Sequence, residues 1–431
     1  MRGHPKESDM TRRDIYVYAD WQNIKKPMLM GVLTSDLLRG KEVFSFEYKD
    51  AWLSSGFAHS LDPDLQLYSG LQYLNDADKI NFGMFLDSAP DRWGRVLMQR
   101  KEAAESRLYK RTRKKLFETD YLLGVYDEHR MGGLRFKTSE DGPFLNDDKR
   151  NAAPPWTSLR ELEQISLKLE DEDAIDNPEY INWLNMLINP GSSLGGARPK
   201  ASVLDPDNHL WIAKFPSKND MGNIGAWEMV TYELAVVAGI DMAQCMAKKY
   251  SSKHHTFLTK RFDRTRNGNR IHFTSAMTQL GYTDGVGAAE GASYLELVDF
   301  ITTYGSNVEA DLHELWRRIV FSICVSNTDD HLRNHGFLLT KEGWRLSPAF
   351  DINPIEVGTG LRLNISEGDN ALDINLAMEV HSYFRLTESK ALEIINQVKD
   401  AVKMWRKFAD DCGISRAEQE LKAAAFNVAT T

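Results

Sequence analysis

One polar stretch between two apolar runs limits the folds open to this chain more than any other feature. In "FSICVSNTDDHLRNHGFLL", residues 321–339, polar side chains separate a helix-like run from a strand-like run. These polar residues are Asn327, Asp329, Asp330, His331 and Asn334. Asp and Asn at a turn often satisfy backbone groups with their own side chains, and carboxylates with imidazole are ordinary metal ligands. A capped turn, a metal site and a loop that acts on phosphate are therefore three open interpretations.

Length and composition indicate an ordinary globular chain. Its 431 residues suffice for two or three domains, each with its own core. Charges interrupt the apolar runs well before the length that a bilayer span needs, so no membrane anchor is expected. The N-terminus, "MRGHPKESDMTRRD", lacks the apolar region of a signal peptide, and the three cysteines are widely spaced. We therefore expect a cytoplasmic protein without a disulfide framework.

The charge pattern has one local exception. A net charge of -9 argues against binding nucleic acid by bulk electrostatics. Residues 95–115, "RVLMQRKEAAESRLYKRTRKK", nevertheless concentrate basic side chains on an expected helix and its exit. A solvated helix face is the favoured interpretation, since charge runs are commonly just that. A patch that contacts phosphate together with a partner is the alternative.

Hydrophobic periodicity divides the chain into four parts. We expect a disordered tail at 1–14, an α+β subdomain at 15–150, a strand-rich lobe with a glycine turn at 151–285, and a helical lobe at 286–431. The paired prolines in "NAAPPWTS" mark the boundary after the α+β subdomain. A small strand-rich lobe followed by a larger helical lobe is a bilobal layout, with a ligand cleft expected between the lobes.

Residues on both sides of this expected cleft suit phosphoryl transfer. "RLSPAFDINP" places Asp351 after an apolar strand end. An Asp, an Asn five positions later and a second Asp beyond a short hairpin match a phosphoryl-transfer loop, in which the first carboxylate accepts a hydroxyl proton and the other two groups hold magnesium. Asp329 and Asn334 occupy the first two positions.

The phosphate-binding end of such a site needs backbone amides and a cation. Gly195 and Gly196 in "GSSLGGARPKAS" allow close approach of the backbone. Lys214 stands among apolar residues in "LWIAKFP", where an unpaired ammonium is costly, and Glu228 on the next helix can pair with it. This order of parts matches protein-kinase-type phosphotransferases.

These motifs, in this order, resemble those of the HipA-type serine/threonine kinase toxins, a bacterial group with a distant protein-kinase fold. "NTDDHLRNHGF" resembles the catalytic loop of that family, "SPAFDINP" its metal-binding segment, and "TKRFDR" its hinge. "SSLGGARPKA" resembles its serine-containing glycine loop, and "APDRWGRVLM" a motif in the N-terminal subdomain of its longer members. The resemblance implies an α+β, bilobal protein-kinase-like fold with an extra N-terminal α+β subdomain.

The resemblance also implies a role for each matching residue. Asp329 would be the catalytic base, while Asn334 and Asp351 would bind Mg²⁺. The residues expected to bind ATP are Gly195, Gly196, Ala197, Lys214, its partner Glu228, and Arg261 and Phe262 at the adenine. Ser193 falls on the serine that family members autophosphorylate, with Ser192 as a second candidate. A phosphate there would fill or expel a loop built to hold ATP phosphates, so the enzyme would limit itself.

Partners follow from the resemblance alone. The usual family partner is a small helix-turn-helix antitoxin of the HipB type, which would bring the chain to operator DNA. The substrate would be a protein serine or threonine, with aminoacyl-tRNA synthetases as the family precedent. A catalytically silent, kinase-like corepressor or scaffold is the alternative function, although every Lys, Asp and Asn position of the active family is present.

Three side chains carry further expectations. His331 is expected to orient the catalytic loop by hydrogen bonds, with Asp330 at the loop surface. Arg198, where an uncharged amide is common in the family, is expected to be solvated. A metal hydrolase is the least favoured function, because the remaining histidines do not fall at the spacings of a dinuclear site.

Overall fold

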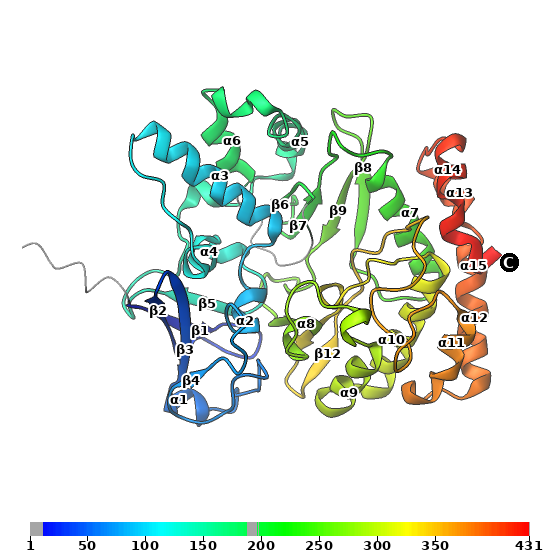
Figure 1. Cartoon of the computed structure of the whole chain (residues 1–431), viewed down its shortest axis with the longest axis horizontal. Helices are drawn as coiled ribbons and strands as arrows, with labels where there is room; N and C mark the ends of the chain where they lie inside the picture. Colours follow the sequence, from blue (N-terminus) through cyan, green and yellow to red (C-terminus); the bar gives the residue numbers. More distant parts are fainter. Residues whose placement is uncertain (1–11, 188–195, 197, 431) are drawn as a thin grey trace, which may run out of the picture. The chain divides into compact units, whose positions relative to one another are not determined.

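The computed structural model describes residues 12–187, 196 and 198–430, which fold into two compact units (Figure 1). Unit 1 consists of Met1–Ala153, Ile175–Ala197 and Asp263–Thr274. Unit 2 consists of Pro154–Ala174, Arg198–Phe262 and Ser275–Thr431. Each unit therefore combines stretches that are distant in the sequence. The four parts expected from the sequence are continuous and do not include such an exchange of segments.

Unit 1 contains a five-stranded antiparallel sheet in the order β4-β3-β2-β1-β5. Its strands are β1 (Arg12–Ala19), β2 (Met28–Leu38), β3 (Lys41–Tyr48), β4 (Gln72–Tyr73) and β5 (Leu134–Lys137). Ile15, Val17 and Ala19 are fully buried and alternate with more exposed residues, as the two-residue period of a strand requires. Because Arg12 already pairs with Asp36 on β2, the last three residues of the expected tail lie in a strand.

Unit 1 also contains helices, which lie between these strands in the sequence or after the last of them. They are α1 (Asp50–Leu53), α2 (Gly83–Asp87), α3 (Arg92–Leu108), α4 (Glu118–Gly124) and α6 (Tyr180–Leu187). The long helix α3 begins after Asp91, whose side chain accepts a hydrogen bond from the Gly94 N–H at 2.7 Å. Such a cap satisfies a backbone donor that has no partner within the helix. The basic stretch expected on a helix thus lies on α3 and on its irregular exit.

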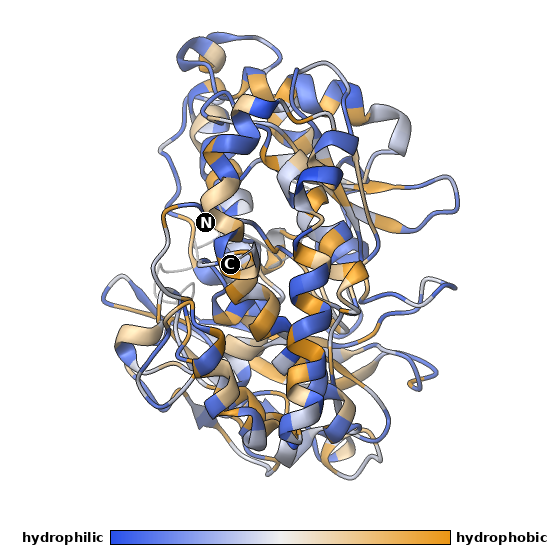
Figure 2. Ribbon diagram, turned by 90° about the vertical axis from the view of Figure 1, so that its right-hand side faces the viewer, coloured by the Kyte–Doolittle hydropathy of each residue, from blue (hydrophilic) through white to orange (hydrophobic). Residues whose placement is uncertain are grey.

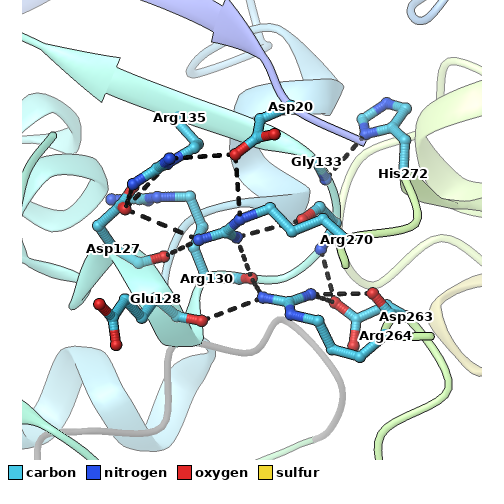
Figure 3. A network of polar contacts seen from close by, with 11 residues as sticks. Asp20, Asp127, Glu128, Arg130, Gly133, Arg135, Asp263, Arg264, Arg270 and His272 are labelled. Carbon is cyan, nitrogen blue, oxygen red and sulfur yellow. Dashed lines mark hydrogen bonds and ion pairs between the residues drawn. The ribbon is translucent and has the colours of Figure 1, made fainter. Parts of the chain in front are cut away.

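A buried network of charged side chains joins the segment Asp263–Thr274 to the rest of unit 1 (Figure 3). Arg270 donates hydrogen bonds to the main-chain oxygens of Asp127, at 2.6 Å, and of Arg130, at 3.2 Å. The carboxylate of Asp263 accepts from the Gly132 N–H at 2.8 Å. The segment Asp263–Thr274 thus forms hydrogen bonds with main-chain groups that precede it by more than a hundred residues.

Arg130, the neighbour of Arg270 in this network, is completely buried. Its guanidinium donates to four main-chain oxygens, those of Ser88, Leu122, Val125 and Leu145. Burial lowers the pKa of Arg130 to about 9, and the charge of Asp127 partly opposes this shift. Because a buried carbonyl without a partner is costly, Arg130 closes several loops of unit 1 at once.

Unit 2 contains a four-stranded antiparallel sheet in the order β6-β7-β9-β8. These strands are β6 (Lys200–Leu204), β7 (Leu210–Lys214), β8 (Cys245–Lys248) and β9 (Thr256–Lys260). Further along the chain are β10 (Phe273–Ser275), which crosses from unit 1 into unit 2, and the antiparallel hairpin of β11 (Gly336–Leu339) and β12 (Trp344–Leu346). The four-stranded sheet of β6, β7, β8 and β9 thus lies in the first half of unit 2.

The rest of unit 2 is mainly helical. Its helices are α5 (Leu159–Lys168), α7 (Ile224–Val237), α8 (Ala276–Gln279), α9 (Tyr294–Tyr304), α10 (Val308–Cys324), α11 (Ile374–Glu379), α12 (Glu388–Val402), α13 (Trp405–Asp411), α14 (Arg416–Lys422) and α15 (Asn427–Thr430). In α12 the buried residues, Ala391, Ile394, Ile395 and Val398 among them, recur at helical spacing. Helices with one hydrophobic and one hydrophilic side are visible in Figure 2.

The α+β class expected from the sequence is confirmed. Unit 2 follows the expected order of a strand-rich part and then a helical part, and unit 1 is the extra α+β portion. No helix in the described part of the chain is long and apolar enough to cross a membrane.

Candidate active site

Lys214, the last residue of β7, lies between two carboxylates. Its Nζ is 2.6 Å from Oε1 of Glu228 and 2.5 Å from Oδ1 of Asp351. Glu228 is on the first turns of α7, which begins after Asn223, whose side-chain oxygen accepts from the Ala226 N–H. Asp351 follows β12. The structure thus brings together the lysine and glutamate expected at the phosphates and the aspartate expected to bind Mg²⁺.

Burial and charge act in opposite directions on this trio. Burial alone would lower the pKa of Lys214, but the charges of Asp351 and Glu228 outweigh it and raise that pKa. Burial also opposes ionisation of Asp351, yet the Lys214 ammonium lowers the pKa of Asp351 to about 2. Burial raises the pKa of Glu228. At neutral pH Asp351 is therefore a carboxylate, the state in which it can bind a metal ion.

The polar turn after α10 places its side chains in different directions. Asp329 is exposed, and its main-chain oxygen accepts from Nδ2 of Asn334 at 3.1 Å. Asn334 is 7% exposed and ends the short 3₁₀ helix η7 (Leu332–Asn334). Its Oδ1 is buried and has no hydrogen-bond partner among the residues that the structure describes. One turn therefore carries a solvent-facing carboxylate and a buried oxygen with free acceptor capacity.

Hydrogen bonds tie this turn to the segment that carries Asp351. Oδ1 of Asn327 accepts from the Asn353 N–H at 3.2 Å, and Nδ2 of Asn353 approaches Oδ1 of Asp351 at 3.4 Å. From α7, the Thr231 hydroxyl donates to the main-chain oxygen of Ile352 at 2.7 Å. Asp351 itself has a φ of +59°, which only a few non-glycine residues adopt. Hydrogen bonds from the polar turn and from α7 thus fix the two residues that follow Asp351, Ile352 and Asn353.

The oxygen atoms in these two segments fit a magnesium ion. Oδ1 of Asn353, like that of Asn334, is buried without a hydrogen-bond partner in the described residues. Mg²⁺ prefers carboxylate and carbonyl oxygens, and it commonly binds one or two protein ligands together with substrate phosphates. Asp351 supplies an ionised carboxylate, while Lys214 supplies a cation for phosphate. The donor set therefore suits Mg²⁺ and a polyphosphate.

Asp330 does not lie at the loop surface, contrary to the expectation from the sequence. It is 5% exposed, accepts a hydrogen bond from the Tyr294 hydroxyl at 2.5 Å, and lies 3.1 Å from Nε2 of His335. Burial opposes its ionisation, but His335 outweighs burial and lowers the pKa of Asp330. The hydrogen bond from Tyr294 and the nearby His335 imidazole compensate the buried carboxylate, which explains why Asp330 is buried while Asp329 is exposed.

Two further expectations concern His331 and Arg198. Nδ1 of His331 is buried without a hydrogen-bond partner in the described residues, while the His331 N–H donates to the Asp329 main-chain oxygen at 2.8 Å, so the orienting role of its side chain stays a prediction. Arg198 is not simply solvated, since its guanidinium forms two hydrogen bonds with Asp220, at 3.0 and 2.7 Å. Asp220 precedes α7, so this pair links the exit of the glycine loop to the segment that leads to Glu228.

Other expected site residues are only partly placed. Gly195, Ala197, Ser192 and Ser193 lie outside the described residues, and Gly196 is exposed. Arg261 is buried, and its N–H donates to the Leu210 main-chain oxygen at 2.9 Å. The Phe262 ring lies 5.5 Å from that of Phe350. The roles of these residues in binding ATP stay predictions.

Lys200 is a residue that the sequence did not identify. It is 1% exposed and stands directly opposite Lys214 in the register of β6 and β7. Side chains of opposed residues lie on the same face of a sheet, where like charges destabilise each other. The charge of Lys200 contributes to the low pKa of Asp351. Only the strand register reveals this second cation, because "RPKASV" reads as an ordinary turn and strand.

A separate group of potential metal ligands lies in the β6–β7 turn. It consists of Asp205, Asp207 and His209 and is the one such group of three in the described residues. The Asp205 carboxylate accepts from the backbone of Asp207 and His209 and from the Trp211 indole N–H. These bonds explain Asp205 as a turn-stabilising residue.

Comparison with known proteins finds a HipA-like domain and a kinase-like relative. Residues 192–405, about half of the chain, match the family model of the HipA-like C-terminal domain. A putative kinase of Haemophilus influenzae is 26% identical over 179 residues, which cover 37% of this chain and 52% of that protein. The chain thus spans about half the length of this relative.

Two solved structures align with the chain. HipA of Shewanella oneidensis MR-1, solved with HipB and operator DNA, aligns with a TM-score of 0.62 at 17% identity, covering 96% of this chain and 95% of that one. The Helicobacter pylori proinflammatory kinase CtkA aligns at 14% identity over 54% of this chain and 94% of its own, with a TM-score of only 0.35. The first of these alignments establishes the fold over nearly the entire chain.

Proposed function

Because this chain belongs to the HipA-like family, we propose that it is an ATP- and Mg²⁺-dependent serine/threonine protein kinase and the toxin of a toxin–antitoxin pair. One observation carries the proposal: Lys214 pairs with both Glu228 and Asp351, next to a turn that presents Asp329 to solvent. A buried cation held by a helix carboxylate and a metal-ligand carboxylate is the arrangement that phosphotransferases of the protein-kinase type use.

Each of these residues would have a distinct task. Bound Mg-ATP would supply its γ-phosphoryl group for transfer to a hydroxyl oxygen, with ADP as the leaving group. Lys214 would neutralise phosphate charge, and Glu228 would keep the ammonium in place. Asp351 and the open oxygen of Asn334 would hold Mg²⁺. Asp329, which faces solvent, would accept the proton of the acceptor hydroxyl as its oxygen attacks phosphorus.

Lys200 would extend the positive charge of the site. Its position opposite Lys214 places a second buried cation on the same face of the sheet.

Regulation and partners belong to the same proposal. Phosphorylation of Ser193 or Ser192 would place about two negative charges on the glycine loop and so limit further turnover. A helix-turn-helix antitoxin of the HipB type would bind the chain and bring it to operator DNA, as the complex of the Shewanella protein suggests. The substrate would be a protein serine or threonine, and an aminoacyl-tRNA synthetase is one candidate.

A labelling experiment tests the activity. Purified wild type, Asp329→Ala and Asp400→Ala are incubated with γ-labelled ATP and Mg²⁺, and incorporation is followed by peptide mapping. Asp400 is a matched control, because it is an aspartate on α12 whose side chain is 74% exposed. We expect wild type and the control to label Ser192 or Ser193, and Asp329→Ala to lose about 10²–10⁴-fold in rate. Equal absence of label in all three proteins, with ATP binding intact, would favour the silent scaffold instead.

A further inference from the structure

The exit of helix α3 is an uninterrupted basic surface. Residues 107–115, "RLYKRTRKK", which we call the basic segment, are all exposed and include no acidic residue. Their basic members are Arg107, Lys110, Arg111, Arg113, Lys114 and Lys115. Only the first two residues of the segment belong to α3, and the remainder has no regular helix or strand structure. The segment thus presents its charges along an irregular backbone beyond a helix end.

Contacts within unit 1 nevertheless hold the basic segment in a defined conformation. Glu102 accepts two hydrogen bonds from the Arg111 guanidinium, at 2.6 and 2.8 Å, and one from the Lys114 N–H at 2.6 Å. The Arg111 hydrogen bond is the main reason why the pKa of Glu102 falls to about 2. Nζ of Lys114 pairs with Asp120 at 2.7 Å, and Nζ of Lys115 donates to the main-chain oxygen of Gly40 at 3.3 Å. The segment is therefore anchored along its second half.

The anchoring contacts leave part of the charge uncompensated. Arg107, Lys110 and Arg113 form no ion pair with any residue in the described part of the chain. Between them lie Leu108 and Tyr109, which are 61% and 68% exposed. A solvated helix face explains charged residues, but it does not explain an exposed tyrosine and leucine between cations. An anchored backbone with free cations is instead typical of a surface that binds a polyanion.

We propose that the basic segment binds the phosphate backbone of duplex DNA directly. Arginine and lysine side chains from an ordered backbone contact DNA phosphates without reading the sequence, and arginine can do so with two parallel hydrogen bonds. Duplex DNA offers a dense row of such charges, about one per 1.7 Å of axis. This contact does not depend on the kinase activity, because the basic segment lies in unit 1 and the catalytic residues lie in unit 2.

The overall charge of the chain sharpens this proposal. A net charge of -9 opposes association with DNA, so the affinity must come from a local group of cations. In a plot of log K against the logarithm of the salt concentration, each phosphate contact contributes about 0.9 to the negative slope, so a site with few contacts has a shallow slope. Arg107, Lys110 and Arg113 would contribute about three such contacts.

Fluorescence anisotropy with the full chain tests this contact. A labelled duplex of arbitrary sequence is titrated with protein at several salt concentrations, from about 50 to 200 mM. We compare wild type with a triple variant, Arg107→Gln, Lys110→Gln and Arg113→Gln. The matched control is Lys25→Gln, Lys26→Gln and Arg266→Gln, which removes three exposed cations of unit 1 outside the segment. All substitutions are at exposed positions, and thermal unfolding verifies that each protein is folded.

We expect the segment variant to bind DNA at least about tenfold more weakly at low salt, with a salt slope smaller by about 2 to 3 units. The control should retain the wild-type slope. Equal losses in both variants, or no DNA binding by wild type at low salt, would overturn the proposal. Equally tight binding of poly-glutamate would also overturn it, because an acidic polypeptide would then be as good a ligand as DNA. Asp329→Ala must bind DNA like wild type, which separates this proposal from the proposed kinase activity.

Discussion

Two buried clusters of charged side chains, one in each unit, differ in what their polar atoms contact. In unit 1, the guanidinium groups of Arg130 and Arg270 donate to main-chain oxygens of several loops. In unit 2, Lys214 donates to two side-chain carboxylates. The side-chain oxygen of Asn334, in the turn that is hydrogen-bonded to the Asp351 segment, has no partner in the described residues. One cluster is therefore directed at the backbone, and the other keeps acceptor atoms available.

This difference separates a structural use of buried charge from a functional one. A buried polar atom without a partner costs free energy, so a fold retains one only where something else compensates it. The arginines of unit 1 remove such costs by satisfying carbonyl groups (Figure 3). The open oxygens of Asn334 and Asn353 keep such a cost, which a bound cation would remove. The following predictions test this distinction.

The largest effect is expected for Asp351→Asn. This change removes the charge of the proposed metal ligand but leaves Glu228 beside Lys214, so the kinase rate should fall about 10³-fold, or ~4 kcal/mol, while the folded state loses at most the roughly 2 kcal/mol that the Asp351 charge contributes. Steady-state phosphorylation kinetics and thermal unfolding measure the two quantities. Asp400→Asn, at a 74% exposed side chain, is the control and should alter neither. A rate within tenfold of wild type would contradict the functional assignment.

A large effect of the opposite kind is expected for Arg130→Met. The variant leaves four buried carbonyl groups without their donor, so the free energy of unfolding should fall by about 3 kcal/mol. Denaturant titration measures it. The control Arg150→Met removes a guanidinium that is 79% exposed and should change stability by less than about 1 kcal/mol. If the two variants were equally stable, the network of unit 1 would not have the structural role given to it.

A smaller effect is expected in the pH dependence of stability. The pKa of Asp351 falls from 3.8 to about 2 on folding, so its contribution is fully present above pH ~4 and is lost as the pH falls towards 2. The shift corresponds to roughly 2 kcal/mol. Denaturant titrations between pH 5 and 2.5, at about half-unit steps, should show a weaker pH dependence for Asp351→Asn than for wild type. Parallel curves for the two proteins would rule out this contribution.

The smallest effect is expected for Gly358→Ala. A Cβ at Gly358 would lie 2.2 Å from Cγ2 of Thr328, the residue before Asp329, so the substitution should cost about 1 kcal/mol and slow phosphorylation severalfold. Thr328→Ala in the same chain should restore part of the stability in a double-mutant cycle. At Gly368 an added Cβ would meet no atom within 4 Å, which makes Gly368→Ala the control. Identical stabilities of the two alanine variants would show that the close approach does not matter.

Parts of the site could be predicted because burial is costly for a lone charge. Lys214 in an apolar strand requires a partner, and Glu228 on the following helix provides one, as the structure confirms. Hydrophobic periodicity likewise predicts a strand-rich part followed by a helical part, while the α+β kinase-like class as a whole comes from the family resemblance. Local pattern and the cost of burial were sufficient in these cases.

Other parts depend on information that a local pattern does not contain. Asp329 and Asp330 are adjacent and chemically identical, and the backbone of the turn decides which one faces Tyr294 and His335. Lys200 becomes a site residue only through the register of β6 with β7. The pairing of Arg270 with the loops around Arg130 spans more than a hundred residues. Such contacts follow from tertiary structure, which overrides local preference.

The contribution of Asp263–Thr274 to unit 1 has a consequence for synthesis. A ribosome makes the chain from its N-terminus, and domains generally fold as they emerge. When residue 153 leaves the ribosome, Arg130 and Asp127 are present, but Arg270 and Asp263 are not. Unit 1 can complete its buried contacts only after the glycine loop, Lys214 and Glu228 have also been made. Maturation of the first unit thus waits for translation of much of the second.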